Sequence, residues 1–112
     1  METTRQQKVS KAILKELSFI FQKETRQFLG NILVTITSAR VSPDLSVAKI
    51  YLSIFPAKDP DESLQVLNNN KKYFRTILAQ SVKNQLRIIP ELIFYLDDSA
   101  EYAEQIESLL KK

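Results

Sequence analysis

Two runs of β-branched residues joined by a short turn constrain the fold of this chain most strongly. Residues 32–41 (ILVTITSARV) and 46–55 (SVAKIYLSIF) both alternate their side chains with the period of two that a strand requires. Between them, residues 42–44 (Ser-Pro-Asp) supply turn chemistry, because proline fixes φ and aspartate bonds to nearby backbone. The alternation slips near Ser38, which indicates a β-bulge. An antiparallel hairpin is therefore predicted.

Lys49 lies in the second run but is not predicted to enter the core. The apolar face of that strand holds every second residue, namely Ala48, Ile50, Leu52 and Ile54. Since successive side chains of a strand point to opposite sides, Lys49 and Tyr51 belong to the other face of the sheet. The pattern leaves open whether that other face is exposed or covered.

Helices are predicted on both sides of the hairpin. Residues 4–26 repeat apolar side chains at helical spacing, with Thr4 as the expected N-cap, and Gly30 is expected to take a positive φ in the loop that follows. A second helix is predicted from about residue 61, with a break at Asn68-Asn69-Asn70 because asparagine competes for backbone hydrogen bonds.

Two helices and a strand complete the predicted elements. Residues 71–87 form a helix that Pro90 ends, and residues 92–96 (LIFYL) form a buried strand. The spacing of Asp98 and Glu101 predicts the start of a last amphipathic helix. The fold class is therefore α+β, in the order α-β-β-α-α-β with a C-terminal helix, as a three-stranded sheet with helices on one face. Because the third strand follows a long helical crossover, it can lie parallel to another strand. This is the layout of a KH-like domain with its hairpin near the N-terminus, although many small α+β folds share the same order of elements.

The composition favours a binding protein over an enzyme. The chain of 112 residues, enough for one domain, contains no His and no Cys, which excludes thiolate nucleophiles, histidine bases and Cys/His metal sites. No cofactor and no small-molecule substrate are expected. Residues 1–90 hold 14 Lys and Arg against 7 Asp and Glu, whereas residues 91–112 hold 2 against 6. A basic body indicates a polyanionic partner, and ordinary solubility is the alternative.

The localisation is predicted from two further features of the sequence. The first residues are too polar for a secretory signal, and no apolar run is long enough to cross a bilayer. We therefore expect a cytoplasmic protein that does not contact a membrane.

Two blocks of sequence carry a resemblance to a known family. VTITSARVSPDLSVAKIYLSIF and, further along, FRTILAQSVKNQLRIIPELIFYLDDS resemble ribosome-binding factor A, in the same order and spacing from Arg5 to about Leu110. The resemblance implies a type II KH-like fold over residues 1–112 as one RNA-binding domain. It also implies binding to the free small (30S) ribosomal subunit and its 16S rRNA during late maturation, assistance to pre-rRNA processing, and a link to growth in the cold. We expect the protein to act as a monomer.

The expected RNA contacts differ from those of a typical KH domain. With one glycine, the chain cannot contain the Gly-x-x-Gly loop that clamps a nucleotide backbone. The family replaces that loop with a helix kink, commonly Ala-x-Gly, and Asn70-Lys71-Lys72 stands at the matching position. Binding must then rest on phosphate contacts and shape. The candidate RNA-binding residues are Arg5, Lys8, Lys11 and Lys15 on the first helix, Lys71, Lys72, Arg75, Lys83 and Arg87 from the kink onward, and Arg40 and Lys49 on the hairpin.

Other functions remain open at this stage. The chain could be a general RNA-binding KH-like module, or a protein–protein adaptor whose acidic last helix docks a basic partner. Tyr51, Tyr73 and Tyr95 could stack on bases, although we interpret Tyr73 and Tyr95 as partly buried in the core. Asp97-Asp98 could act as paired carboxylates, but a helix cap explains them better.

Overall fold

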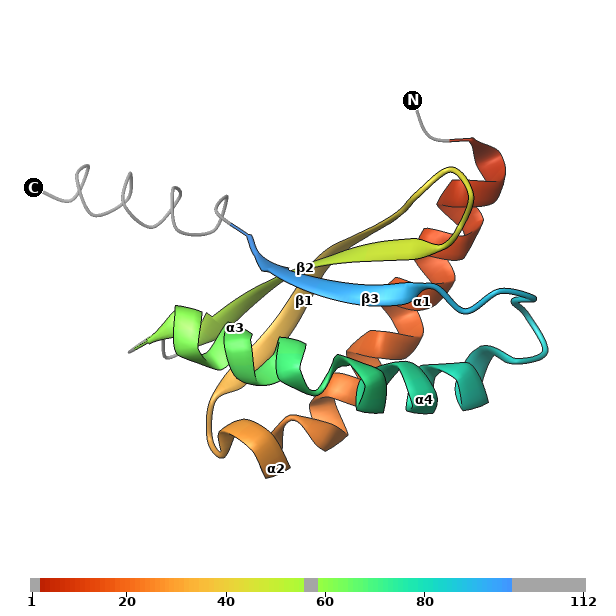
Figure 1. Ribbon diagram of the computed structural model, residues 1–112. Helices are drawn as coiled ribbons and strands as arrows, with labels where there is room; N and C mark the ends of the chain where they lie inside the picture. Colours follow the sequence, from red (N-terminus) through yellow and green to blue (C-terminus); the bar gives the residue numbers. More distant parts are fainter. Residues whose placement is uncertain (1–2, 56–58, 98–112) are drawn as a thin grey trace, which may run out of the picture.

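The computed structural model describes residues 3–55 and 59–97. In this part of the chain the elements are α1 (Thr4–Glu24), α2 (Arg26–Leu29), β1 (Leu33–Val41), β2 (Val47–Phe55), α3 (Pro60–Asn69), α4 (Lys71–Val82) and β3 (Glu91–Leu96) (Figure 1). The predicted α+β order is confirmed, with the one-turn helix α2 as an addition. The expected last helix, its acidic face and its cap at Asp98 lie outside the described residues.

The sheet has the strand order β1-β2-β3, with β2 in the centre. β1 and β2 pair antiparallel, and their register shifts between Ile36 and Ser38, so the predicted bulge is confirmed. β3 pairs parallel to β2, as the long crossover allowed. The helices lie on one face of the sheet, as expected for the type II KH-like arrangement (Figure 1).

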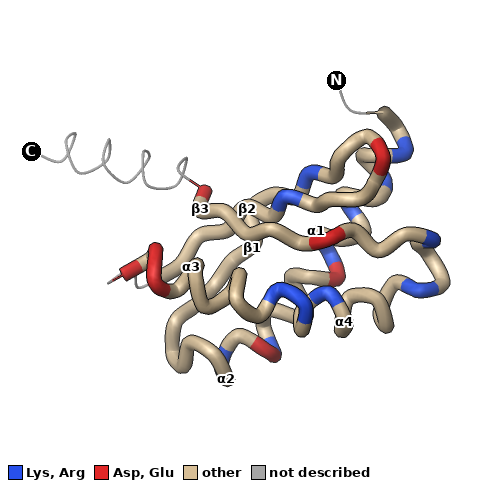
Figure 2. The backbone as a smooth tube through the Cα atoms, in the orientation of Figure 1, with Lys and Arg blue, Asp and Glu red and all other residues tan. Residues whose placement is uncertain are grey.

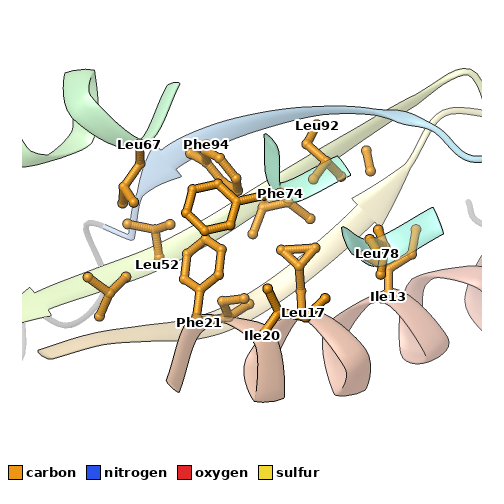
Figure 3. Close-up of a cluster of buried hydrophobic side chains, with 14 of the residues drawn as sticks. Ile13, Leu17, Ile20, Phe21, Leu52, Leu67, Phe74, Leu78, Leu92 and Phe94 are labelled. Carbon is orange, nitrogen blue, oxygen red and sulfur yellow. The ribbon is translucent and has the colours of Figure 1, made fainter. Parts of the chain in front are cut away.

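The core fills the space between the sheet and the helices (Figure 3). The predicted faces of α1 and β2 are buried, including Ile13 and Leu17 from α1 and Ile50 and Leu52 from β2. At its centre three phenylalanine rings from three elements meet: the Phe21 ring centroid lies 4.8 Å from that of Phe74 and 5.4 Å from that of Phe94. Among the helices described, none is both long and apolar enough to cross a bilayer.

Side chains from the helices bond to backbone groups of both outer strands. On β1, the Gln6 Nε2 group donates to the carbonyl oxygen of Val41 at 3.1 Å, and the Val41 N–H donates to Ser10 Oγ at 3.3 Å. On β3, the Phe94 N–H donates to Asn68 Oδ1 at 2.9 Å, while Asn68 Nδ2 donates to the Phe94 carbonyl at 3.1 Å. These helix side chains therefore stand where a further strand would otherwise pair.

The predicted break between α3 and α4 is confirmed at Asn70. This residue has φ −111° and ψ 17°, outside the helical region, and the next helix starts at Lys71. Its side-chain Nδ2 donates to the carbonyl oxygen of Val66 at 2.8 Å, which satisfies one of the free carbonyls of the last turn of α3. An asparagine side chain therefore maintains the kink, without the glycine that is usual in the family that the sequence resembles.

One predicted helix cap and one predicted helix end were wrong. The N-cap of α1 is Thr3 rather than Thr4, because the Thr3 hydroxyl accepts from the Gln6 N–H while the Gln6 side chain accepts from the Thr3 N–H. The helix predicted over residues 71–87 ends at Val82, whose carbonyl accepts the N–H groups of Gln85 and Leu86 in a turn. Residues 88–90 (Ile-Ile-Pro) favour extended backbone and oppose continuation of the helix.

The turns before and within the hairpin follow the sequence chemistry. Gly30 has φ 66°, as predicted, and ends α2. In the hairpin turn, the Asp44 carboxylate accepts from the Ser42 and Ser46 hydroxyls, both at 2.7 Å, and from the Ser46 N–H at 3.1 Å. These hydrogen bonds, that from the Ser42 hydroxyl foremost, lower the pKa of Asp44 to about 2. Leu45 beside it has φ 63° and is buried.

Candidate nucleic-acid interface

The first basic set lies along the exposed side of α1. Val9, Ile13 and Leu17 are buried, so the helical period turns the predicted cations away from the core. Arg5, Lys8, Lys11 and Lys15 are accordingly all exposed. The sequence pattern therefore placed this set on the correct side of the helix.

The second basic set does not form one helical stripe as predicted. Because α4 ends at Val82, Lys83 and Arg87 belong to the loop that leads to β3. Lys72 is exposed at the start of α4, and Lys71 Nζ lies 3.3 Å from Glu91 Oε1 in an ion pair whose side chains are partly exposed. Such pairs contribute little to stability in water.

Arg75 has a structural contact that the sequence pattern did not indicate. Its Nε group donates to the Pro90 carbonyl at 3.1 Å, and its Nη2 group donates to the Ile89 carbonyl at 2.7 Å. The guanidinium therefore fixes the end of the α4–β3 loop against α4. Both acceptors are neutral, so the positive charge of Arg75 is retained.

The ends of the two basic sets meet at one groove. The start of α1, the β1–β2 turn and the α4–β3 loop lie at the same end of the molecule (Figure 1), where Figure 2 shows several of the Lys and Arg positions. The groove has a volume of about 430 Å³ and is lined by Arg5, Lys8, Val9, Ala12, Leu45, Gln85, Leu86, Arg87 and Ile88. Three cations thus flank an apolar floor, and none of the lining residues is a carboxylate.

Arg40 and Lys49 lie on the face of the sheet opposite the helices. They are direct partners across β1 and β2, and both side chains are exposed. The next row on this face contains Tyr51 and Tyr95, whose rings stack with centroids 5.6 Å apart. The interpretation of Tyr95 as partly buried in the core was wrong: Leu92 and Phe94 take the core positions of β3, so Tyr95 points outward and is 38% exposed.

Tyr73 lies at the rim of the core. Its ring contacts Phe28 and the buried Phe74, with centroids 5.5 and 5.7 Å apart, and it remains 40% exposed. The Tyr73 hydroxyl donates to Glu24 Oε2 at 2.8 Å. These contacts tie α4 to the end of α1.

A comparison with protein families decides the relationship that the two sequence blocks indicated. The model of a family described as ribosome-binding factor A matches residues 5–110. This chain belongs to the ribosome-binding factor A family.

Curated members of the ribosome-binding factor A family align over nearly the whole chain. The protein from Cytophaga hutchinsonii is 48% identical over 112 residues, which cover 100% of this chain and 84% of that protein. The protein from Christiangramia forsetii is 41% identical over 111 residues, covering 98% and 85%.

Solved structures show the same fold. The crystal structure of ribosome-binding factor A from Thermus thermophilus has a TM-score of 0.64 at 24% identity, covering 81% of this chain and 94% of that one. A homology model of the Thermus thermophilus protein, fitted into the cryo-EM map of a 30S–RbfA complex, has a TM-score of 0.63 at 24% identity and covers 78% and 89%.

The groove of this ribosome-binding factor A relative also involves residues that the sequence analysis did not select. Leu45 looked like an ordinary turn residue, and Leu86 and Ile88 were assigned to a helix and its end. The only available signal was the apolar character of residues 86 and 88, which flank Arg87 in the sequence. Nothing in the sequence relates these residues to α1, because their proximity depends on the route of the crossover.

Proposed function

We propose that this protein binds the free 30S ribosomal subunit through 16S rRNA, assists pre-rRNA processing in late maturation, and does so without catalysis. Residues 1–112 would act as a single KH-like RNA-binding domain, as a monomer in the cytoplasm, with a role in growth in the cold. The observation behind the proposal is the groove at which Arg5, Lys8 and Arg87 meet without a carboxylate among the lining residues. It is supported by membership of the family and by the 30S complex in which the Thermus thermophilus protein has been fitted.

The groove suits a nucleotide backbone for two reasons. Cations from separate elements can contact successive phosphates, and each phosphate that is neutralised releases counterions. The apolar floor formed by Val9, Leu45 and Ile88 offers a surface for a sugar or a base edge. A backbone clamp of glycines is not needed for this mode of binding, which relies on charge and shape.

The remaining candidate residues extend this surface in different ways. Lys11 and Lys15 continue the positive charge along α1, and Lys83 extends it along the α4–β3 loop. Lys71 and Lys72 add charge at the kink, next to β3. Arg75 acts indirectly, since it holds the loop that presents Arg87.

Co-sedimentation with free 30S subunits across a range of salt concentrations tests the proposal. The logarithm of the binding constant should fall linearly with the logarithm of the salt concentration, with a slope that reflects several phosphate contacts. Replacement of Arg5→Glu and Arg87→Glu together should reduce both the affinity and the slope. Lys23→Glu together with Arg26→Glu is the matched control, because this double variant makes the same change in net charge at two exposed cations, in the last turn of α1 and at the start of α2, that do not line the groove.

Three results would contradict the proposal. Binding that does not depend on salt would exclude phosphate contacts as the main source of affinity. Equal losses from the groove variant and from the double variant Lys23→Glu with Arg26→Glu would show that only net charge matters. Equal affinity for whole ribosomes and free 30S subunits would exclude a role confined to maturation.

A further inference from the structure

The face of the sheet opposite the helices has two features that the fold does not require. Along each strand the buried residues alternate with residues of this outer face, and in the described ranges 3–55 and 59–97 no helix covers it (Figure 1). One row across the strands reads Arg40, Lys49 and Ile93, and the row beside it reads Ser38, Tyr51 and Tyr95.

The first feature is the pair of like charges in the first row. Arg40 and Lys49 are directly opposite each other on antiparallel strands, an arrangement that destabilises a sheet. Among the residues that the structure describes, no ion pair or hydrogen bond of either side chain compensates their charges. An uncompensated pair of cations at adjacent positions is suited to an anionic ligand.

The second feature is the pair of stacked tyrosines. The Tyr51 and Tyr95 ring planes are inclined by 26°, so the two rings form a short aromatic stack across β2 and β3. Tyr95 is on the edge strand of the described sheet, so within residues 3–55 and 59–97 one side of its ring has no neighbouring strand. The residue on the other side of Tyr51 is the small Ser38. In the part of the chain that the structure describes, both ends of the stack are therefore free of large neighbours across the sheet.

We propose that this outer face binds unpaired nucleotides, with bases stacked on Tyr51 and Tyr95 and phosphates held by Arg40 and Lys49. Lys49 and Tyr51 are two residues apart on β2, about 7 Å along the strand, which is the scale of one nucleotide. Aromatic side chains beside a positively charged track are the general means of binding single strands. Bases inside a duplex are already stacked, so this surface selects single-stranded RNA.

The inference rests on the proposed function and makes it more specific. The groove accounts for affinity to phosphates, which duplex and single strand share, whereas the outer face of the sheet adds preference for unpaired rRNA. A protein segment is the competing occupant. We favour RNA because two uncompensated cations lie beside the aromatic pair, and the exposed apolar pair Leu33 and Phe55 is at the other end of the strands.

The test compares a single-stranded oligouridylate with an RNA duplex of the same length, by fluorescence anisotropy. Tyr51→Leu and Tyr95→Leu together should lower the affinity for the single strand by about fivefold or more and leave that for the duplex within about twofold. Phe55→Ala is the matched control, because it removes an exposed aromatic from the same face, two rows away from the tyrosine pair, and should change neither affinity.

A second variant separates loss of binding from loss of folding. Arg40→Gln and Lys49→Gln together remove the repulsion between the strands, so the thermal midpoint should stay level or rise while the affinity for oligouridylate falls. A protein that is more stable and binds RNA more weakly cannot be explained by unfolding.

Unchanged affinity of the tyrosine variant for oligouridylate would overturn the inference. If the same variant also lost binding to 30S subunits, the outer face would be assigned to a protein contact instead. The variant Arg5→Glu with Arg87→Glu, measured in parallel, should weaken binding to both RNAs. Suppose that the groove variant bound both RNAs as tightly as the native protein, while the tyrosine variant lost affinity for oligouridylate. The proposed role of the groove would then fail, and the proposed role of the outer face would stand.

Discussion

The amide of Asn68 provides a sharp test of how the sheet is completed. Asn68 is on α3, and its side chain replaces a neighbouring strand for Phe94 by donating one hydrogen bond and accepting another. Asn68→Ala removes both. At about 0.5 to 1.5 kcal/mol for each hydrogen bond, the free energy of unfolding should fall by about 1 to 3 kcal/mol. For a domain of this size the thermal midpoint should fall by about 4 °C for each kcal/mol.

Asn68→Asp makes the prediction more demanding. An ionised carboxylate keeps the bond from the Phe94 N–H, but its second oxygen then faces the Phe94 carbonyl, which Asn68 Nδ2 approaches to 3.1 Å in the native protein. This contact should raise the pKa of the introduced carboxyl, because only the protonated form can donate to that carbonyl. A group whose folded pKa is raised stabilises the protein below its unfolded pKa of about 3.9, and the stabilisation is lost as the pH rises.

Urea denaturation at neutral and at acid pH measures both effects. Relative to the native protein, Asn68→Asp should be strongly destabilised at pH 7 and recover below about pH 4, whereas the deficit of Asn68→Ala should not depend on pH. The reasoning would be refuted if both variants unfolded at the native urea concentration, or if their deficits changed in parallel with pH.

Three further substitutions test other parts of the fold. Phe74→Ala should lower the free energy of unfolding by about 3 to 5 kcal/mol in chemical denaturation, because its ring is fully buried between Phe21 and Phe94. Gly30→Ala should lower the free energy of unfolding by about 1 to 3 kcal/mol through backbone strain at φ 66°, even though the space around a new methyl group is open. A denaturation midpoint equal to that of the native protein would contradict this. The native Asp44 carboxylate stabilises the protein above about pH 4, and this stabilisation is lost as the pH falls toward its folded pKa of about 2. Asp44→Asn should remove it. Between about pH 4 and about pH 2 the thermal midpoint should therefore fall less for the variant than for the native protein.

The hairpin could be predicted in detail because its signals are local. Alternation alone decides which face each side chain takes, so Lys49 was placed correctly outside the core, and the slip at Ser38 marked the bulge. The kink at Asn70 was predicted for a similar reason, since the competition between an asparagine side chain and the helix involves residues one turn apart.

The end of α4 was predicted less well because the local pattern continues beyond it. Residues 83–87 extend the amphipathic period of the helix, but tertiary contacts favour a turn that lets Leu86 pack against the core and Arg75 bind the loop. The same turn brings Arg87 to Arg5. The groove was therefore outside the reach of periodicity, which describes one element at a time.

The central position of β2 also has a consequence for the order of folding. Its antiparallel partner is the preceding strand, so β1 and β2 can pair early across a short turn. Its parallel partner begins at Glu91, so the pairing of Val47 with that residue must close a far longer loop, which costs more chain entropy. During synthesis, β2 must then keep one edge unpaired until β3 leaves the ribosome. We therefore expect docking of β3 to be the late step that limits folding of this chain, and the interval before it to be the period of greatest exposure to aggregation.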